Sequence, residues 1–199
     1  DISRYTLTEG KIFNLEDTLI NFRNDVLEKI EKGEYQPTYI KTGYPDLDRK
    51  LGGGFSQGSF VILGARASVG KTTFALNLME KMALEGHKVL FFSLEQPKEQ
   101  ILARFLSKTL EVQFNKILNG DTTSLLERWP GSDLGELFDN AVNSISKFAE
   151  NILIVDDSNL RIDQIKNQTR KYEREKDIDI VFIDYLQFIK PKERMESRL

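Results

Sequence analysis

The residues best suited to chemistry are Lys71 and Thr72, which end the stretch GARASVGKT. The apolar residues 60–63 precede the small residues of this stretch and predict a buried strand, and apolar residues at helical spacing follow it. A strand, a glycine-containing turn, Lys-Thr and a helix are typical of a phosphate-binding loop, or P-loop. Backbone N–H groups of the turn and the helix N-terminus would bind phosphate oxygens. Lys71 would reach the β- and γ-phosphates, and the Thr72 hydroxyl would bind Mg²⁺.

One position departs from the strict pattern G-x-x-x-x-G-K-[ST], because Ala65 stands where the first Gly is expected. Alanine keeps the position small but disfavours positive φ. The alternative is a chance Gly-Lys-Thr in a turn between strand and helix, and the agreement of all three elements argues against it. The residues expected to surround the nucleotide phosphates are Ala65, Arg66, Ala67, Ser68, Val69, Gly70, Lys71, Thr72 and Thr73.

Two carboxylates follow apolar runs further along the chain. Glu95 comes just after residues 88–93 (KVLFFS), and Asp184 ends residues 178–184 (IDIVFID). Parallel strands bring their carboxyl ends to the sheet edge at which ligands bind. Glu95 is therefore placed to orient or deprotonate an attacking water, and Asp184 to hold the Mg²⁺ shell as a Walker B aspartate does. The alternatives are a charge at a helix N-terminus for Glu95 and a chance strand-end acid for Asp184.

The residues after Asp184 suggest that nucleotide binding is connected to binding of a nucleic acid. The amide of Gln187 could sense a γ-phosphate, and residues 190–199 (KPKERMESRL) are rich in cations. A solvated charge run is the alternative, and composition alone favours it. The candidates for contacts to single-stranded nucleic acid are Lys190, Lys192, Arg194 and Arg198.

Hydrophobic periodicity predicts the elements that position these residues. Helices are expected at residues 15–32, 97–110, 134–148 and 162–173, besides the helix after the P-loop. Strands are expected at residues 60–63, 88–93, 151–155 and 178–184, and residues 111–132 are expected to be irregular. The fold class is therefore α/β, with a mostly parallel sheet flanked by helices. The apolar stripe of residues 15–32 packs either on its own domain or on a neighbouring copy, and amphipathicity alone does not choose.

Bulk properties exclude several classes of protein. The 199 residues suit one domain, or one domain with an arm, and no apolar run approaches membrane-spanning length. With no cysteine and one histidine, thiol nucleophiles, cysteine-metal sites and histidine triads are excluded or disfavoured. These features fit a cytoplasmic protein with no membrane partner. A net charge of −3 means that nucleic-acid binding would need local basic loops.

Taken together, four stretches resemble the RecA-type motor domain of DnaB-like replicative helicases. They are TGYPDLD, ARASVGKT, FFSLE followed by Arg104, and VFIDYLQF, and the resemblance covers about residues 15–199. The family's loop also begins with Ala, so Ala65 supports the resemblance rather than weakening it. Val69 fills the family's usual Met position and Ala67 its usual Pro. The resemblance implies an arm and linker helix at residues 1–40, and a RecA-like P-loop ATPase domain, truncated at its C-terminal end, at residues 41–199.

The resemblance further implies an ATP-driven DNA helicase that translocates on single-stranded DNA. It implies a homohexamer with ATP and Mg²⁺ at subunit interfaces, the linker helix docked on the neighbouring subunit, and primase and a helicase loader as candidate partners. Lys71, Glu95 and Gln187 would be catalytic, Glu95 as the carboxylate and Gln187 as the γ-phosphate sensor. Arg104 would join the nucleotide-binding residues, and Thr72 and Asp184 would serve the metal.

Two departures from the family pattern accompany the resemblance. The family's N-terminal helical domain does not precede the linker, and its arginine finger and later DNA-contacting segment would lie beyond Leu199. We therefore expect weak ATP hydrolysis from this chain alone. The alternative functions are a RadA- or KaiC-like RecA-family ATPase in recombination, repair or regulation, and a nucleotide-gated assembly module without hydrolysis. Residues 93–95 and 184–187 favour the helicase, and Glu95 argues against the assembly module.

Overall fold

The computed structural model describes residues 14–33, 39–66 and 68–190. The chain divides into two compact units, residues 1–38 and 39–199, and each is described by itself. The first contains helix α1 (Leu15–Lys32), which the sequence predicts at the same residues. The Asn14 side chain accepts from the Glu16 N–H at 2.8 Å, and Gly33 ends the helix in the left-handed conformation. None of the side chains of α1 is buried within its own unit, so what covers its apolar stripe stays a prediction.

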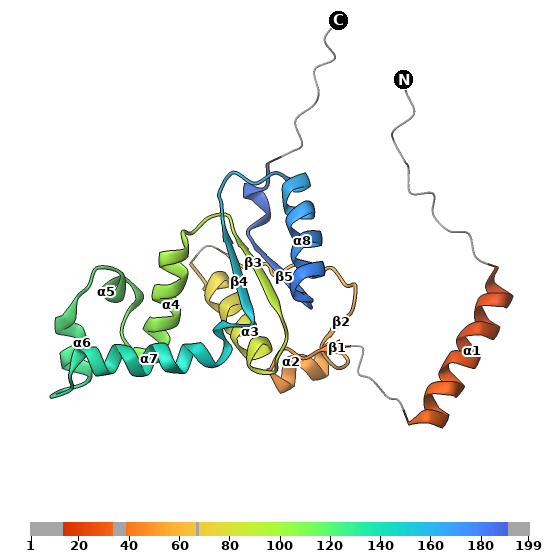
Figure 1. Ribbon diagram of the computed structural model, residues 1–199, viewed down its shortest axis with the longest axis horizontal. Coiled ribbons are helices and arrows are strands. Elements are labelled where there is room, and N and C mark those ends of the chain that lie inside the picture. Colours follow the sequence, from red (N-terminus) through yellow and green to blue (C-terminus); the bar gives the residue numbers. More distant parts are fainter. Residues whose placement is uncertain (1–13, 34–38, 67, 191–199) are drawn as a thin grey trace, which may run out of the picture. The chain divides into compact units, whose positions relative to one another are not determined.

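The second unit is built on a parallel sheet of three strands in the order β4–β3–β5. β3 (Val89–Ser93) pairs with β4 (Ile152–Asp156) on one side and with β5 (Ile180–Asp184) on the other. Ser93 lies level with both Asp156 and Asp184, so the carboxyl ends of the strands meet at one edge (Figure 1). This is the edge that the sequence predicts for the site.

Alternate side chains of β3 enter two separate cores. Val89 and Phe91 pack in a cluster with α3 (Lys71–Leu84), α4 (Lys98–Leu110) and α7 (Leu134–Ala149). Leu90 and Phe92 pack on the other face, with Leu160 and with Ile165 of α8 (Ile162–Lys176). Helices therefore cover both faces of the sheet, with α3 and α8 on opposite sides (Figure 1).

Most of the predicted elements are confirmed within three residues at each end. The helices predicted at 97–110, 134–148 and 162–173 are α4, α7 and α8, and the strands predicted at 88–93, 151–155 and 178–184 are β3, β4 and β5. The short 3₁₀ helix η1 (Leu186–Phe188) follows β5. Among the described residues, no helix combines the length and the apolar character that crossing a lipid bilayer requires.

The prediction of a buried strand at residues 60–63 is wrong. Phe60, Val61, Ile62 and Leu63 lie outside every strand and are 78%, 53%, 67% and 42% exposed. An apolar run becomes a strand only when a neighbouring backbone pairs with it, and no described residue does so here. The sheet therefore has one parallel strand fewer than the sequence predicts.

The prediction that residues 111–132 are irregular is also wrong, because two short helices lie there. They are α5 (Phe114–Leu118) and α6 (Thr122–Arg128). The Asp121 carboxylate accepts from the Ser124 N–H at 3.3 Å and caps α6, and buried Leu125 packs in a third cluster with α4 and α7. Residues 119–121 form the turn between these two helices.

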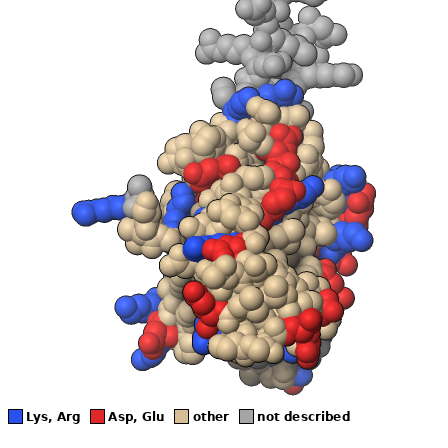
Figure 2. All heavy atoms as spheres, turned by 90° about the vertical axis from the view of Figure 1, so that its left-hand side faces the viewer, with Lys and Arg blue, Asp and Glu red and all other residues tan. Residues whose placement is uncertain are grey.

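Helices α4 to α7 form a lobe whose surface carries mixed charge. Figure 2 views the molecule from the side on which α5 and α6 lie in Figure 1. On this face Lys and Arg side chains are interspersed with Asp and Glu side chains. The described residues of this face thus give no broad basic field, in keeping with the net charge of −3.

The stretch before the P-loop, residues 39–58, contains short elements of its own. It contains β1 (Tyr39–Ile40), which pairs antiparallel with β2 (Phe55–Ser56), and α2 (Pro45–Lys50). Asp48 of α2 accepts from the buried Thr42 N–H at 2.8 Å and from its hydroxyl at 2.7 Å. At Gly54, with φ of 136°, an added Cβ would lie 2.4 Å from the Ile40 carbonyl oxygen, so only glycine fits.

Candidate functional site

The turn before α3 leaves backbone N–H groups open to an anion. Gly70 precedes the helix with φ of 104°, and no side chain caps the helix start. Ser68 also takes positive φ, at 63°, whereas Ala65 is absent from the described residues with positive φ. The loss of glycine at position 65 therefore costs this loop no conformation that it uses. Ala67 lies outside the described residues.

Two residues of α3 converge on one residue of β5. The Thr72 hydroxyl donates to Asp184 Oδ2 at 2.6 Å, and Lys71 Nζ lies 3.7 Å from Asp184 Oδ1. Asp184 is only 6% exposed, so its charge needs these partners. Both Thr72 and Asp184 present oxygen atoms of the kind that Mg²⁺ prefers. The structure thus brings together the lysine, the hydroxyl and the carboxylate that the sequence assigns to phosphate and metal.

An aromatic ring completes this group, and sequence reasoning assigned it no role. Lys71 Nζ lies 3.9 Å from the centre of the Tyr185 ring, a cation–π distance. Burial, and then the negative charges of Glu95 and Asp184, raise the pKa of the Tyr185 hydroxyl. The only sequence signal was an aromatic residue directly after the strand-end aspartate.

Glu95 lies at the turn that follows β3. The buried Leu94 donates its N–H to the Asp184 carbonyl at 2.9 Å, which ties this turn to the end of β5, and Glu95 itself is exposed. The start of α4 is capped from elsewhere, because Asp156 Oδ2 accepts from the Lys98 N–H at 3.0 Å. Asp156, rather than Glu95, therefore supplies the carboxylate that binds the first N–H of α4.

Arg104 of α4 is held from two sides. Its Nε donates to Gln96 Oε1 at 3.1 Å, and its guanidinium lies 4.4 Å from the centre of the Phe114 ring. Arg104 and Thr73 line one groove of about 360 Å³ between α3 and α4. A direct contact from Arg104 to nucleotide stays a prediction.

The residues after β5 are placed only in part. Gln187 lies exposed on η1, and its side chain makes no hydrogen bond within the described part of the chain. Lys190 Nζ donates to Asn159 Oδ1 at 2.6 Å, and the Lys190 backbone N–H donates to the Leu160 carbonyl at 3.1 Å. Lys192, Arg194 and Arg198 lie outside the described residues, so the nucleic-acid contacts predicted for these basic residues remain predictions.

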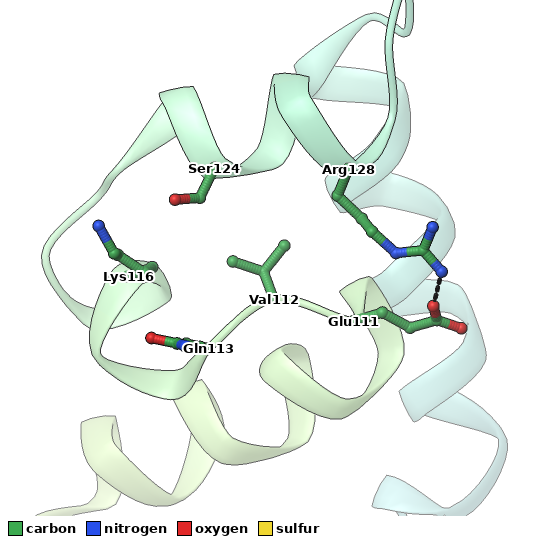
Figure 3. A pocket seen from close by; sticks show the side chains of 6 residues that line it. All are labelled: Glu111, Val112, Gln113, Lys116, Ser124 and Arg128. Atoms are coloured by element: carbon green, nitrogen blue, oxygen red, sulfur yellow. Dashed lines mark hydrogen bonds and ion pairs between the residues drawn. The ribbon is translucent and has the colours of Figure 1, made fainter.

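A second hollow lies in the helical lobe, away from these residues. It measures about 240 Å³ and is lined from α5, α6 and the end of α4, by Glu111, Val112, Gln113, Lys116, Ser124 and Arg128 (Figure 3). Arg128 is paired with Glu111, and Lys116 Nζ lies 2.7 Å from Asp121 Oδ2. This pairing raises the pKa of Lys116 and lowers that of Asp121. Since both cations are already neutralised, the hollow offers little to an anion.

The fold and these contacts define a class of protein. Glu95 and Asp184 lie at the carboxyl edge of a parallel sheet flanked by helices. The start of α3 has no side-chain cap, and its residues Lys71 and Thr72 contact Asp184. This arrangement is that of a RecA-like P-loop NTPase domain. In the described residues no group of three or more His, Asp or Glu side chains is arranged to hold a metal by itself.

Comparison with known proteins gives the family. Residues 39–199 match the family model of the DnaB-like helicase C terminal domain, and the chain belongs to this family. It is 33% identical to the replicative DNA helicase DnaB of Haemophilus influenzae over 98% of this chain and 40% of that protein. It is 36% identical to DnaB of Buchnera aphidicola over 89% of this chain and 36% of that protein.

Solved structures agree with this assignment. One of them, described as an ATPase domain, matches with a TM-score of 0.70 and 28% identity, over 94% of this chain and 62% of that one. A DnaB-like replicative helicase, described with its interactions with primase, matches with a TM-score of 0.68 and 28% identity, over 94% of this chain and 42% of that one. The chain spans about 40% of the length of the first curated relative. The comparisons favour the helicase family over the RadA- and KaiC-like alternatives.

Proposed function

We propose that this chain is the ATP-hydrolysing motor of a replicative DNA helicase. The observation that carries the proposal is the convergence of Lys71 and Thr72 on Asp184, at 3.7 and 2.6 Å, beside the turn that holds Glu95. Family membership supports it, because the relatives are named replicative DNA helicases.

The residues fit a magnesium nucleotide. The open N–H groups at the start of α3 and the Lys71 ammonium would bind the phosphate oxygens. The Thr72 hydroxyl and the Asp184 carboxylate would hold Mg²⁺, whose charge offsets that of the phosphates. In this arrangement Lys71 leaves the Tyr185 ring and the Asp184 carboxylate to reach the phosphates.

Glu95 would act on the attacking water. Its carboxylate is exposed at the carboxyl edge of the sheet, where it can accept a hydrogen bond from a water and take its proton. Gln187 would report the presence of the γ-phosphate to the residues that follow it. The proposed catalytic residues are therefore Lys71, Glu95 and Gln187, with the other P-loop residues around the nucleotide.

The proposal extends to assembly and to DNA. Each nucleotide would lie at an interface in a homohexameric ring, and helix α1, whose side chains are unburied in its own unit, would dock on a neighbouring copy. Lys190, Lys192, Arg194 and Arg198 would contact the phosphates of single-stranded DNA. Primase is a candidate partner, because a structure similar to this chain is described with its interactions with primase.

Strand displacement on a forked duplex tests the proposal. The full-length protein is incubated with the duplex and Mg²⁺, with ATP, with a non-hydrolysable ATP analogue, or without nucleotide. We expect the strands to separate only with ATP. Hydrolysis of ATP without strand separation would favour a recombination or regulatory ATPase, and nucleotide-dependent assembly without hydrolysis would favour an assembly module.

A further inference from the structure

The turn that carries Glu95 is held through the residue next to it. The Ser93 hydroxyl donates to the Gln96 carbonyl, so the turn is closed across Glu95. The Gln96 side chain accepts from Arg104 Nε at 3.1 Å. Backbone and side chain of Gln96 are thus both held, while the Glu95 carboxylate beside it is left exposed.

Arg104 is itself fixed in place by its surroundings. It lies between buried Ala103 and Phe105 on α4, and its guanidinium lies 4.4 Å from the centre of the Phe114 ring on α5. The guanidinium is planar by resonance, and packing against the Phe114 ring fixes the orientation of that plane, so Nε is presented to Gln96 in a defined direction. The Glu95 turn is thereby connected to the α4–α7 lobe through two side chains.

We propose that Gln96 and Arg104 form a positioning pair, which sets the orientation of the Glu95 carboxylate without touching the reacting atoms. This inference rests on the proposed ATPase activity. Hydrolysis depends on where the base stands relative to the water, and a displacement of about 1 Å can cost about a hundredfold in rate. The role of Arg104 here is distinct from a direct contact to nucleotide.

Three variants of the full-length protein test the pair. Gln96→Met removes the acceptor at similar volume, Arg104→Met removes the donor, and the double variant removes both. We expect each single variant to lower kcat for ATP about tenfold or more. The Kd for a fluorescent ATP analogue should stay within about twofold, because phosphate and metal contacts are intact. The double variant should lose no more than either single variant, because the two residues act as one unit.

Controls separate positioning from a general loss of structure. Gln96→Glu keeps an oxygen acceptor for Arg104 and should retain most of the kcat of the unmodified protein. Gln113→Met makes the same change at an exposed glutamine whose side chain caps no N–H of α5, and should leave kcat unchanged. Thermal melting of every variant, followed by circular dichroism, should give Tm values close to that of the unmodified protein.

The results divide the possible interpretations. The positioning pair is overturned if Gln96→Met keeps its kcat, or if Arg104→Met raises the Kd for nucleotide while Gln96→Met does not. The second result would mean that Arg104 binds the nucleotide directly. Failure of the proposed ATPase activity looks different, because the unmodified protein would then not hydrolyse ATP at all.

Discussion

Thr72 and Asp184, 112 residues apart in sequence, are joined by a hydrogen bond of 2.6 Å between the hydroxyl and Oδ2. The bond connects the first turn of α3 with the last residue of β5. It also stabilises a carboxylate that is almost removed from solvent, which is a structural role, and its two partners are the residues proposed to bind Mg²⁺, which would be a chemical role. The two roles can be separated by experiment.

Thr72→Val should weaken nucleotide binding in the presence of Mg²⁺. The valine keeps the shape of the side chain but removes the hydroxyl, which would deprive the proposed Mg²⁺ of a ligand and deprives buried Asp184 of a donor. The lost bond should also lower the free energy of unfolding by about 1–3 kcal/mol. Affinity for a fluorescent ATP analogue, measured with Mg²⁺ and with EDTA, checks the metal role. Thr72→Ser should restore binding, and an equal loss of affinity in both buffers would contradict it.

Lys71→Ala should abolish nucleotide binding, because the ammonium is the cation that the first turn of α3 offers to the proposed phosphate site. The measurement is titration with the same analogue, followed by the rate of ATP hydrolysis in the full-length protein. Lys98→Ala is the matched control, since Lys98 is exposed at the start of α4 and its ammonium lies 4.0 Å from Glu99. Unchanged ATP hydrolysis in Lys71→Ala would show that this stretch is not a P-loop.

Glu95→Gln should bind ATP normally and lose hydrolysis by about a hundredfold or more, because an amide cannot take the proton of water. Glu99→Gln makes the same change on an exposed residue of α4 and should be silent. Binding and turnover are measured on the same preparation. If Glu95→Gln still turns over ATP at the normal rate, another group positions the water.

Neutralising Lys192 and Arg194 together should weaken binding to single-stranded DNA and flatten its salt dependence. Each lost phosphate contact reduces the slope of log K against log salt by about 0.7. Fluorescence anisotropy with a labelled oligonucleotide at several salt concentrations gives this slope. Lys166→Ala with Arg170→Ala removes the same charge from exposed positions on α8 and is the control. Equal slopes in the test and control variants would mean that residues 190–199 are a solvated charge run and do not contact DNA.

Phe91→Ala should destabilise the fold by about 3–5 kcal/mol, because the central strand would lose a fully buried ring. Leu102→Ala, at a position 50% exposed on α4, should cost far less. Urea unfolding of both variants measures the difference. A comparable loss at both positions would mean that β3 is not the centre of the core.

Much of the fold was predictable from periodicity. The central strand is an uninterrupted apolar run, and helices α1, α4 and α7 repeat apolar residues at helical spacing, so local sequence and packing agree. Residues 60–63 show the opposite case. Their apolar character predicts a strand, but strand formation also depends on a paired neighbour, which the run itself does not encode.

The site was predictable where a residue acts through its type and position in a motif. Lys71, Thr72 and Asp184 are of this kind, and the structure brings them together. Tyr185 and Gln96 were missed because their contacts depend on side-chain direction across two elements. Lys71 of α3 contacts the Tyr185 ring, and Arg104 in the second turn of α4 donates a hydrogen bond to Gln96. No spacing rule in the sequence marks either contact.

The exposed residues 60–63 have a consequence for handling the protein. These four consecutive apolar side chains are exposed, and their backbone pairs with no described strand. Such a segment can pair with the same segment of another chain, which favours aggregation. Light scattering that rises more steeply than in proportion to protein concentration would reveal it. Replacing Ile62 with lysine would place a charge in the run and should slow such aggregation, so colloidal stability becomes a property that a single position can adjust.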